Sequence, residues 1–231
     1  AGGAAPTQVC VTDCELLIGA GQIGLLCIDH ALTDIQHNRL YADEAGTPAQ
    51  RGIVVAGSAA RTVTVAHNHV THAAQGIAVG LSRHDAPDSA PLQVERVQVL
   101  HNRVQIGLGE RDLQRNRFGI FIGNARSLAL DGNQVTLPDE RLGRQLALEA
   151  IRLTGAYGLM VRVTGNHSFG TRIGIRFSPV PPLPDLQDGQ RQGVPACLWR
   201  FEGNLAEQAS EVIAAEKDVL ARLTETANLA V

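Results

Sequence analysis

One frame recurs along this chain: two apolar residues stand five and three positions before an Asn, and a third stands two positions after it. The clearest copy is TVTVAHNHV, where Val63, Val65 and Val70 surround Asn68. The frame recurs at Asn38, Asn102, Asn133 and Asn166, with weaker copies at Cys14 and Asn204. These copies lie 24 to 38 residues apart, and self-similarity at such a spacing is typical of a solenoid.

Each copy is followed by a second apolar pair, usually introduced by glycine, as in Gly76-Ile77-Ala78-Val79 and Gly119-Ile120-Phe121-Ile122. Alternation with period two in such short runs indicates strands. One repeat therefore predicts a strand, a sharp turn at the Asn, a short strand, a loop and a third strand. We expect the Asn itself to adopt the left-handed conformation that a sharp turn needs. We also expect the stacked Asn side chains to bond one another in a ladder with a spacing of about 4.8 Å.

This V-x-V-x-x-N-x-V and G-I-x-V pattern resembles the repeats of right-handed parallel β-helices of the pectin lyase-like family, over about residues 9 to 204. The resemblance implies a fold and no single function, since that fold hosts lyases, hydrolases, epimerases, adhesins and phage tailspikes. It also implies that a substrate cleft would lie over the third strand of each repeat. The flanking loops are the long segments 105–118 and 136–150 and the Pro-rich segments 80–93 and 178–196.

The outward residues of the third strands are where the resemblance places catalysis, and they include a small cationic patch. In chain order they are Leu26, Val54, Ala78, Phe121, Arg152 and Arg176. Arg152 and Arg176 fall in adjacent repeats, and we expect Arg172, Arg117 and Glu149 near them. Because the planar arginine fork suits carboxylate, sulfate or phosphate, this patch is a candidate site for an anionic glycan. Two solvated arginines paired with loop acids are the alternative.

Catalytic signatures of the family are missing from this row. Glycoside hydrolysis needs two carboxylates at a defined separation, and calcium-dependent elimination needs an acidic cluster and a base. Neither set occurs among the outward residues. A catalytic alternative therefore depends on acids in the loops, namely Asp85, Asp88, Glu110, Asp112, Asp139 and Glu140.

Histidines occur directly before the turn Asn in three successive repeats, at His37, His67 and His101, and Arg39, His69 and Arg103 follow the same turns. Imidazole is a good transition-metal ligand. However, a linear row does not converge on one ion, and the neighbouring arginines repel a cation. We therefore interpret the two rows as a stacked polar turn, and we predict no metal site and no cofactor.

Composition narrows the function classes further. The 20 Lys and Arg against 23 Asp and Glu give a net charge of −3, which does not favour a nucleic-acid partner. No apolar run approaches the roughly 18 residues of a membrane-spanning helix. Aromatic residues make up 3% of the chain, so we expect a core of aligned Val, Ile and Leu and no aromatic platform for sugars.

The cysteines, Cys10, Cys14, Cys27 and Cys197, do not identify a compartment, and Cys14 merely replaces the turn Asn. The chain opens with Ala1 and has one methionine, Met160. We interpret it as a fragment or a processed product.

Residues 205–226 contain no Gly or Pro, and they place Val212, Ala215, Val219, Leu220 and Leu223 on one helical stripe. This pattern predicts an amphipathic helix that would cover the stack or a partner. Asn204 is then either a seventh turn Asn or the cap of this helix. The predicted organisation is a β-helix domain over residues 1–204, followed by a helix and tail over residues 205–231.

The sequence therefore predicts an all-β fold, a right-handed parallel β-helix of about six to seven coils with a C-terminal amphipathic helix. We expect a non-catalytic structural or binding module of a larger extracellular, bacterial-surface or phage-tail-like assembly. Its expected partners are other protein subunits, further coils of a longer chain, or an anionic glycan. The alternative is a polysaccharide lyase or glycoside hydrolase with catalytic residues in its loops.

Overall fold

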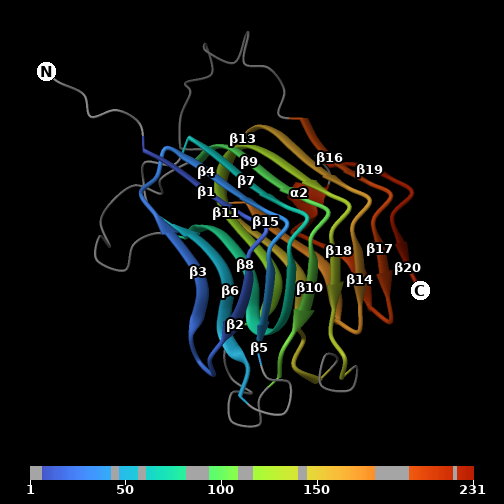
Figure 1. The fold of residues 1–231 in the computed structure, drawn as a ribbon. Helices are drawn as coiled ribbons and strands as arrows, with labels where there is room; N and C mark the ends of the chain where they lie inside the picture. The colour runs from blue at the N-terminus through green and yellow to red at the C-terminus, as the bar shows by residue number, and fades with distance from the viewer. Residues whose placement is uncertain are drawn as a thin grey trace, which may run out of the picture.

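The computed structural model of the protein describes residues 7–42, 47–56, 61–81, 94–108, 117–139, 145–179, 198–220 and 223–231. In these residues the chain winds through successive coils, and every strand pairing is parallel, between one coil and the next (Figure 1). The predicted β-helical solenoid is confirmed at this level. Its coils share three sheets, which meet at corners.

The first sheet holds the strands before the turn Asn, and the second holds the strands after it. The first sheet consists of β1 (Gln8–Thr12), β4 (Leu32–Gln36), β7 (Thr62–Ala66), β9 (Val94–Leu100), the second half of β11 (Phe118–Asp131), the second half of β13 (Glu149–Thr164), β16 (Leu198–Glu202) and β19 (Thr224–Thr226). The second sheet consists of β2 (Glu15–Ile18), β5 (Arg39–Ala42), the first half of β8 (His69–Leu81), β10 (Arg103–Ile106), β12 (Gln134–Thr136), β14 (His167–Phe169), β17 (Leu205–Glu207) and β20 (Leu229–Ala230).

The third sheet is built from the strands that the glycines introduce. It consists of β3 (Ile23–Ile28), β6 (Ala49–Ala56), the second half of β8, the first halves of β11 and β13, β15 (Ile173–Pro179) and β18 (Glu211–Ala214). Three long strands, β8, β11 and β13, therefore continue around a corner from one sheet into the next.

The core is the inside of the coil, and the repeat frame fills it. Val63, Val65 and Val70 around Asn68 are all fully buried, as are Leu130 and Val135 around Asn133. In the C-terminal coils aromatic rings replace part of this aliphatic filling. Phe177 lies 5.2 to 5.5 Å, between ring centroids, from Tyr157, Trp199 and Phe201. Four of the eight Phe, Tyr and Trp residues of the chain thus gather at one end of the core.

Glycine introduces the third strands because the corner before them has no room for a side chain. A Cβ on Gly76 would come within 2.2 Å of Cγ1 of Val104, and one on Gly119 within 2.3 Å of Cγ1 of Val135. Real Cβ atoms do not approach other atoms so closely. The aliphatic filling of the second sheet therefore dictates glycine here.

The turn Asn residues form the predicted ladder. Cys14 N donates to Asn38 Oδ1 at 3.0 Å, and the backbone N and Nδ2 of Asn38 both donate to Asn68 Oδ1, at 3.0 and 2.9 Å. The same pattern repeats up to Asn228. Each Nδ2 also donates to backbone carbonyl groups, so the amides satisfy the buried polar groups of the corner.

The left-handed conformation, however, belongs to the residue before the Asn. The φ angles at this position are +54° at Asp13, +56° at His37 and His67, and +54° at His101. They are +62°, +61° and +61° at Gly132, Gly165 and Gly203, and +55° at Ala227. Our expectation that the Asn adopts this conformation was wrong, because the Asn side chain is fully used in the ladder while the turn is made one residue earlier.

The predicted C-terminal amphipathic helix is also wrong. Residues 205–207, 211–214 and 224–226 are strands that continue the stack, and the one helical segment described there is the single turn α2 (Lys217–Leu220). Asn204 is a turn Asn, since its Oδ1 accepts from Asn166 and its amides donate to Asn228. The preceding coil offers a row of unpaired backbone groups along its edge, and pairing with them outweighs the helical periodicity of the segment.

Candidate functional site

The outward row of the third sheet places the two predicted arginines side by side. Arg152 pairs with Arg176 between β13 and β15, and Phe121 precedes them in the same register. The repulsion between the two guanidinium groups is reduced, because each of them bonds the carboxylate of Glu149. Arg152 Nε donates to Glu149 Oε2 at 2.5 Å, and Arg176 Nε donates to Glu149 Oε1.

Glu149 is buried, with 5% of its surface exposed. The guanidinium carbon of Arg152 lies 5.5 Å from the centroid of the Phe118 ring, which adds a cation–π contact. A carboxylate held on both oxygens by guanidinium groups is well compensated for its burial. We call Arg152, Glu149 and Arg176 the arginine cluster. It is a network of two ion pairs that share Glu149, and its net charge is one positive.

The other two predicted members of this site have separate roles. Arg117 is buried, and its Nη1 donates to the carbonyl oxygen of Gly107 at 2.5 Å. Arg172 is exposed just before β15, and its carbonyl oxygen accepts from the backbone N and the Oγ of Ser210 at 2.9 and 3.0 Å. The Arg117 side chain therefore bonds the start of β11 to the residue that follows β10, and the backbone of Arg172 bonds one coil to the next.

The rest of the row is apolar and mostly covered. Leu26 is 52% exposed at the edge of the sheet, while Val54 and Ala78 are buried although they point outward. Of the loop acids that the catalytic alternative needs, Asp139 is exposed just beyond β12. The remaining five, Asp85, Asp88, Glu110, Asp112 and Glu140, lie outside the described residues.

A second polar region lies at the corner of the Asn ladder. His37, His67 and His101, which we call the histidine row, stack ring on ring. The centroid distances are 4.9 and 5.3 Å and the interplanar angles 3° and 23°. On the other side of the ladder, β5, β8 and β10 place Arg39, His69 and Arg103 in register; we call these the arginine row.

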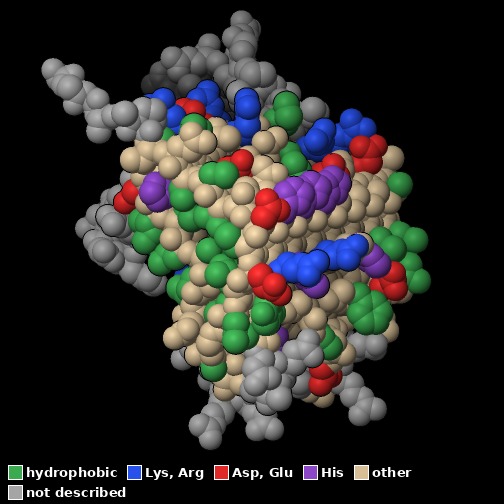
Figure 2. Space-filling view, viewed as in Figure 1, with side chains coloured by type: hydrophobic (Ala, Val, Ile, Leu, Met, Phe, Trp, Pro, Cys, Tyr) green, Lys and Arg blue, Asp and Glu red, His purple; other side chains and the backbone are tan. Residues whose placement is uncertain are grey.

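The two rows are the walls of one groove. Figure 2 shows the histidines as a purple band across the stack and, parallel to it, a band of blue and purple side chains, with a tan strip between them. An open space of about 530 Å³ is lined by both rows and by the ladder residues Asn38 and Asn68. We call it the His/Arg groove. All six wall side chains are exposed.

Charge in the groove is unevenly distributed. The His69 side chain is exposed but partly shielded from solvent, and this partial burial and the positive charges of Arg103 and Arg39 lower its pKa. Asp13 and Glu15 precede His37 and Arg39 in the two rows, so acidic groups stand at one end. The centre of the groove is therefore positive through Arg39 and Arg103.

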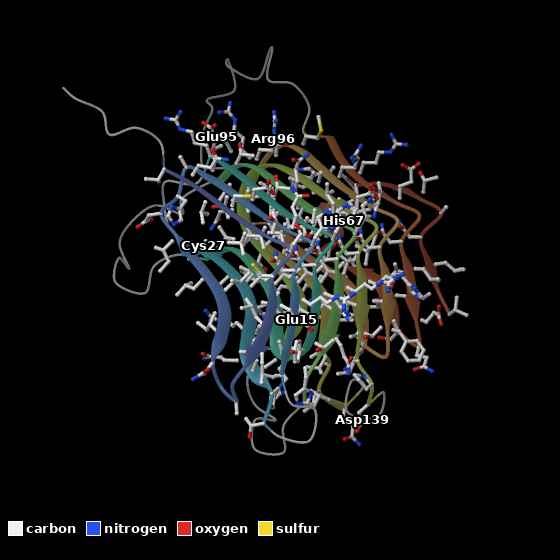
Figure 3. All side chains as sticks on the ribbon, viewed as in Figure 1. Glu15, Cys27, His67, Glu95, Arg96 and Asp139 are labelled. Carbon is white, nitrogen blue, oxygen red and sulfur yellow. The ribbon has the colours of Figure 1, made fainter. Side chains whose placement is uncertain are left out.

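A third polar region lies at the opposite end of the first sheet. Thr62, Glu95, Arg96, Arg126, Ser127 and Met160 line a shallow depression there. In Figure 3 Glu95 and Arg96 lie near the top of the view and Asp139 near the bottom, with His67 between them. Arg96 and Arg126 bring two positive charges to this depression and Glu95 one negative charge, so its net charge is one positive.

Comparisons of the chain with protein-family models, with curated proteins and with solved structures find no match. Over the part of the chain that is described, no helix is long and apolar enough to cross a membrane. No group of three or more His, Cys, Asp and Glu side chains there is arranged to hold a metal ion. Cys10, Cys14 and Cys27 are free thiols, and burial raises the pKa of Cys27.

The sequence identified the members of both rows but interpreted them as a structural turn. What it did not reveal is that the left-handed position falls on the histidines. A signal was present: the same position is glycine at Gly132, Gly165 and Gly203, which marks it as the residue with positive φ.

Proposed function

We propose that this chain is a right-handed parallel β-helix of the pectin lyase-like kind that acts as a non-catalytic structural or binding module. It works within a larger extracellular, bacterial-surface or phage-tail-like assembly, where it contacts partner proteins or an anionic ligand. The repeat frame supports the family resemblance. The lack of an accessible carboxylate pair among the outward residues of the third sheet supports a non-catalytic role.

The observation that carries this proposal is the arginine cluster. Its carboxylate, Glu149, is buried and bonded to guanidinium groups on both oxygens. A general acid or base must reach the proton that it transfers, and a nucleophile must reach the sugar. A carboxylate that is buried and bonded in this way stabilises the pairing of adjacent strands and is poorly placed to react with a substrate.

The ends of the described stack support a role in assembly. At one end β1, β2 and β3 have a neighbour on one side each, and Leu17 and Leu26 there are 71% and 52% exposed. At the other end Leu229 and Val231 are 57% and 69% exposed. Open strand edges with exposed apolar side chains favour pairing with further strands, which further coils or a partner subunit would supply.

The test is release of reducing sugars or unsaturated products from a panel of acidic polysaccharides. It compares the wild type with an Arg152→Ala/Arg176→Ala variant whose folding is checked by circular dichroism. We expect no turnover above the blank from either protein. Turnover by the wild type that the double variant abolishes would overturn the proposal and establish the catalytic alternative.

A further inference from the structure

The His/Arg groove has features that the fold itself does not need. Gly132, Gly165 and Gly203 make the same turn in the later coils, with φ of +61° to +62°. The histidines make it at +54° to +56°, a region that disfavours residues with a Cβ. Unfavourable backbone conformations that recur in one place are often retained for function.

The stack decides which atoms of the imidazoles face outward. Because each ring lies against the next at 4.9 and 5.3 Å, the ring faces are covered. The edges of these exposed rings remain for a ligand. At the end of the row His101 lies over Gly132, where a Cβ would come within 2.2 Å of Nδ1. Glycine thus leaves room for the last ring.

A metal ion does not fit these nitrogens. Zinc and similar ions bind imidazole nitrogen at about 2.0 to 2.1 Å, so two nitrogens on one ion must converge to within about twice that distance. Rings stacked in parallel direct their lone pairs in parallel and do not converge. The neighbouring Arg39 and Arg103 also repel a cation.

An anion fits instead. The guanidinium groups of Arg39 and Arg103 are exposed, and neither has a hydrogen-bond or ion-pair partner within the described chain. Imidazole N–H groups on one wall and guanidinium N–H groups on the other offer donors from two sides. A planar carboxylate presents its two oxygens in one plane, whereas a tetrahedral oxyanion presents oxygens to both walls at once.

The length of the groove also limits the length of the ligand that can contact all of its wall residues. The histidine row extends about 10 Å from His37 to His101, and Arg39 and Arg103 are separated by the same two coils. One phosphate does not span this distance, but a short chain of phosphates does.

We propose that the His/Arg groove is a binding site for an oligophosphate chain, held by Arg39 and Arg103 on one wall and by the histidine row on the other. The inference rests on the proposed function as a binding module and specifies its ligand class. The phosphates come either free, as a short polyphosphate, or as part of a larger phosphorylated molecule.

The acidic groups near the groove stand at its two ends. The charged and titratable groups around it are Asp13 and Glu15 at one end, Arg39, His69 and Arg103 across the ladder, and Asp131 at the other end. Asp131 already accepts a hydrogen bond from Thr164 Oγ1 at 2.7 Å. The centre of the groove, between Arg39 and Arg103, therefore remains open to an anion.

The test is calorimetric titration of the whole chain with tripolyphosphate at low salt, at about pH 6 and about pH 8. Arg39→Gln/Arg103→Gln should weaken binding by about tenfold or more, since each substitution removes charge-assisted hydrogen bonds. The matched control is Arg126→Gln/Arg162→Gln, which removes the same charge from exposed positions on the first sheet and should change affinity by less than about twofold. Equal losses in the two variants, or no binding by the wild type, would overturn the proposal.

A second variant separates binding from folding. His37→Gly/His67→Gly/His101→Gly introduces the residue that three other coils already have at this position, so it should fold with an unchanged melting temperature. It should bind tripolyphosphate more weakly than the wild type at both pH values, because it removes the imidazole donors of one wall. An affinity equal to that of the wild type would overturn the role of the histidine row.

Competing polyanions test the ligand class. Polyglutamate, dextran sulfate and a single-stranded DNA oligonucleotide are titrated at equal charge concentration. Tighter binding of tripolyphosphate than of all three supports the proposal; tighter binding of any of them replaces the ligand class with its own. Failure here leaves the polysaccharide assay of the proposed function unaffected, whereas turnover in that assay would overturn the proposed function without changing the measured affinity of the groove for tripolyphosphate.

Discussion

The turn at the Asn ladder is built twice in this molecule with different residues. In the earlier coils histidine precedes Asn38, Asn68 and Asn102, and in the later coils glycine precedes Asn133, Asn166 and Asn204. The backbone is the same in both regions. Arg103 N donates to Asn68 O and His167 N to Asn133 O, both at 2.8 Å, and all the preceding residues have φ between +54° and +62°.

This comparison separates what the fold needs from what it tolerates. The fold needs a left-handed residue followed by an Asn, and glycine supplies the first at no steric cost. Histidine in the left-handed region costs about 1 to 2 kcal/mol per residue. The Asn is therefore a structural requirement in both regions, while the histidines are explained by their outward side chains.

The largest expected effect is loss of a ladder Asn. Asn102 is fully buried. Its Oδ1 accepts from N and Nδ2 of Asn68 at 3.0 Å, and its Nδ2 donates to Val65 O at 2.8 Å and Asn133 Oδ1 at 3.0 Å. Asn102→Ala leaves several of these buried partners unsatisfied, at about 1 to 3 kcal/mol each. We expect a total loss of about 3 to 5 kcal/mol in urea unfolding.

The control for this prediction is the adjacent residue. His101→Gly should change the free energy of unfolding by less than about 1 kcal/mol, because relief of the left-handed conformation is offset by the greater freedom of glycine in the unfolded chain. Comparable losses for Asn102→Ala and His101→Gly would mean that the histidines are as structural as the ladder.

The next effect in size comes from adding a Cβ on the glycine side of the comparison. Gly132 and Gly203 have φ of +62° and +61°, so alanine incurs a similar conformational cost of about 1 kcal/mol at both. A Cβ at Gly132 also meets the His101 ring, whereas nothing lies within 4 Å of one at Gly203. Gly132→Ala should therefore be about 1 kcal/mol more destabilising than Gly203→Ala.

A double-mutant cycle tests the cause of that difference. In a His101→Gly background the ring is absent, so Gly132→Ala and Gly203→Ala should become equal within error. A difference that persists without the ring would show that His101 does not lie over Gly132 in solution.

Much of the fold was predictable because strand spacing and alternation leave few choices. Once Asn68 and Asn102 share a frame, Val65 and Val99 must both point inward, and the register of Arg152 with Arg176 follows from the same frame. The contact of Glu149 with both arginines follows from this register.

Corners and ends were less predictable because local sequence does not determine them. The burial of Arg117 against Gly107 depends on the path of a loop. The segment after Asn204 has a helical stripe, yet it pairs with β15 and β16 because the edge of the stack offers partners that the segment alone cannot reveal. Asn228 was missed for a similar reason: Glu225 occupies a frame position where an apolar residue was expected.

The smallest expected effect is a pH dependence of folding that comes from the arginine row. Burial and the charges of Arg103 and Arg39 lower the pKa of His69 in the folded state. As the pH falls through about 6.5, His69 binds a proton in the unfolded chain before it does so in the folded chain. The free energy of unfolding therefore decreases with falling pH.

Urea midpoints of the wild type and of His69→Gln, measured between about pH 8 and about pH 5, isolate this contribution. The midpoint of the wild type should fall more steeply with acidification, and Arg39→Gln/Arg103→Gln should reduce the difference because it removes two of the three causes of the lowered pKa. Bound tripolyphosphate should act in the opposite direction, since an anion beside Arg39 and Arg103 favours the protonated form of His69. A slope in His69→Gln as steep as that of the wild type would assign the pH dependence to other groups.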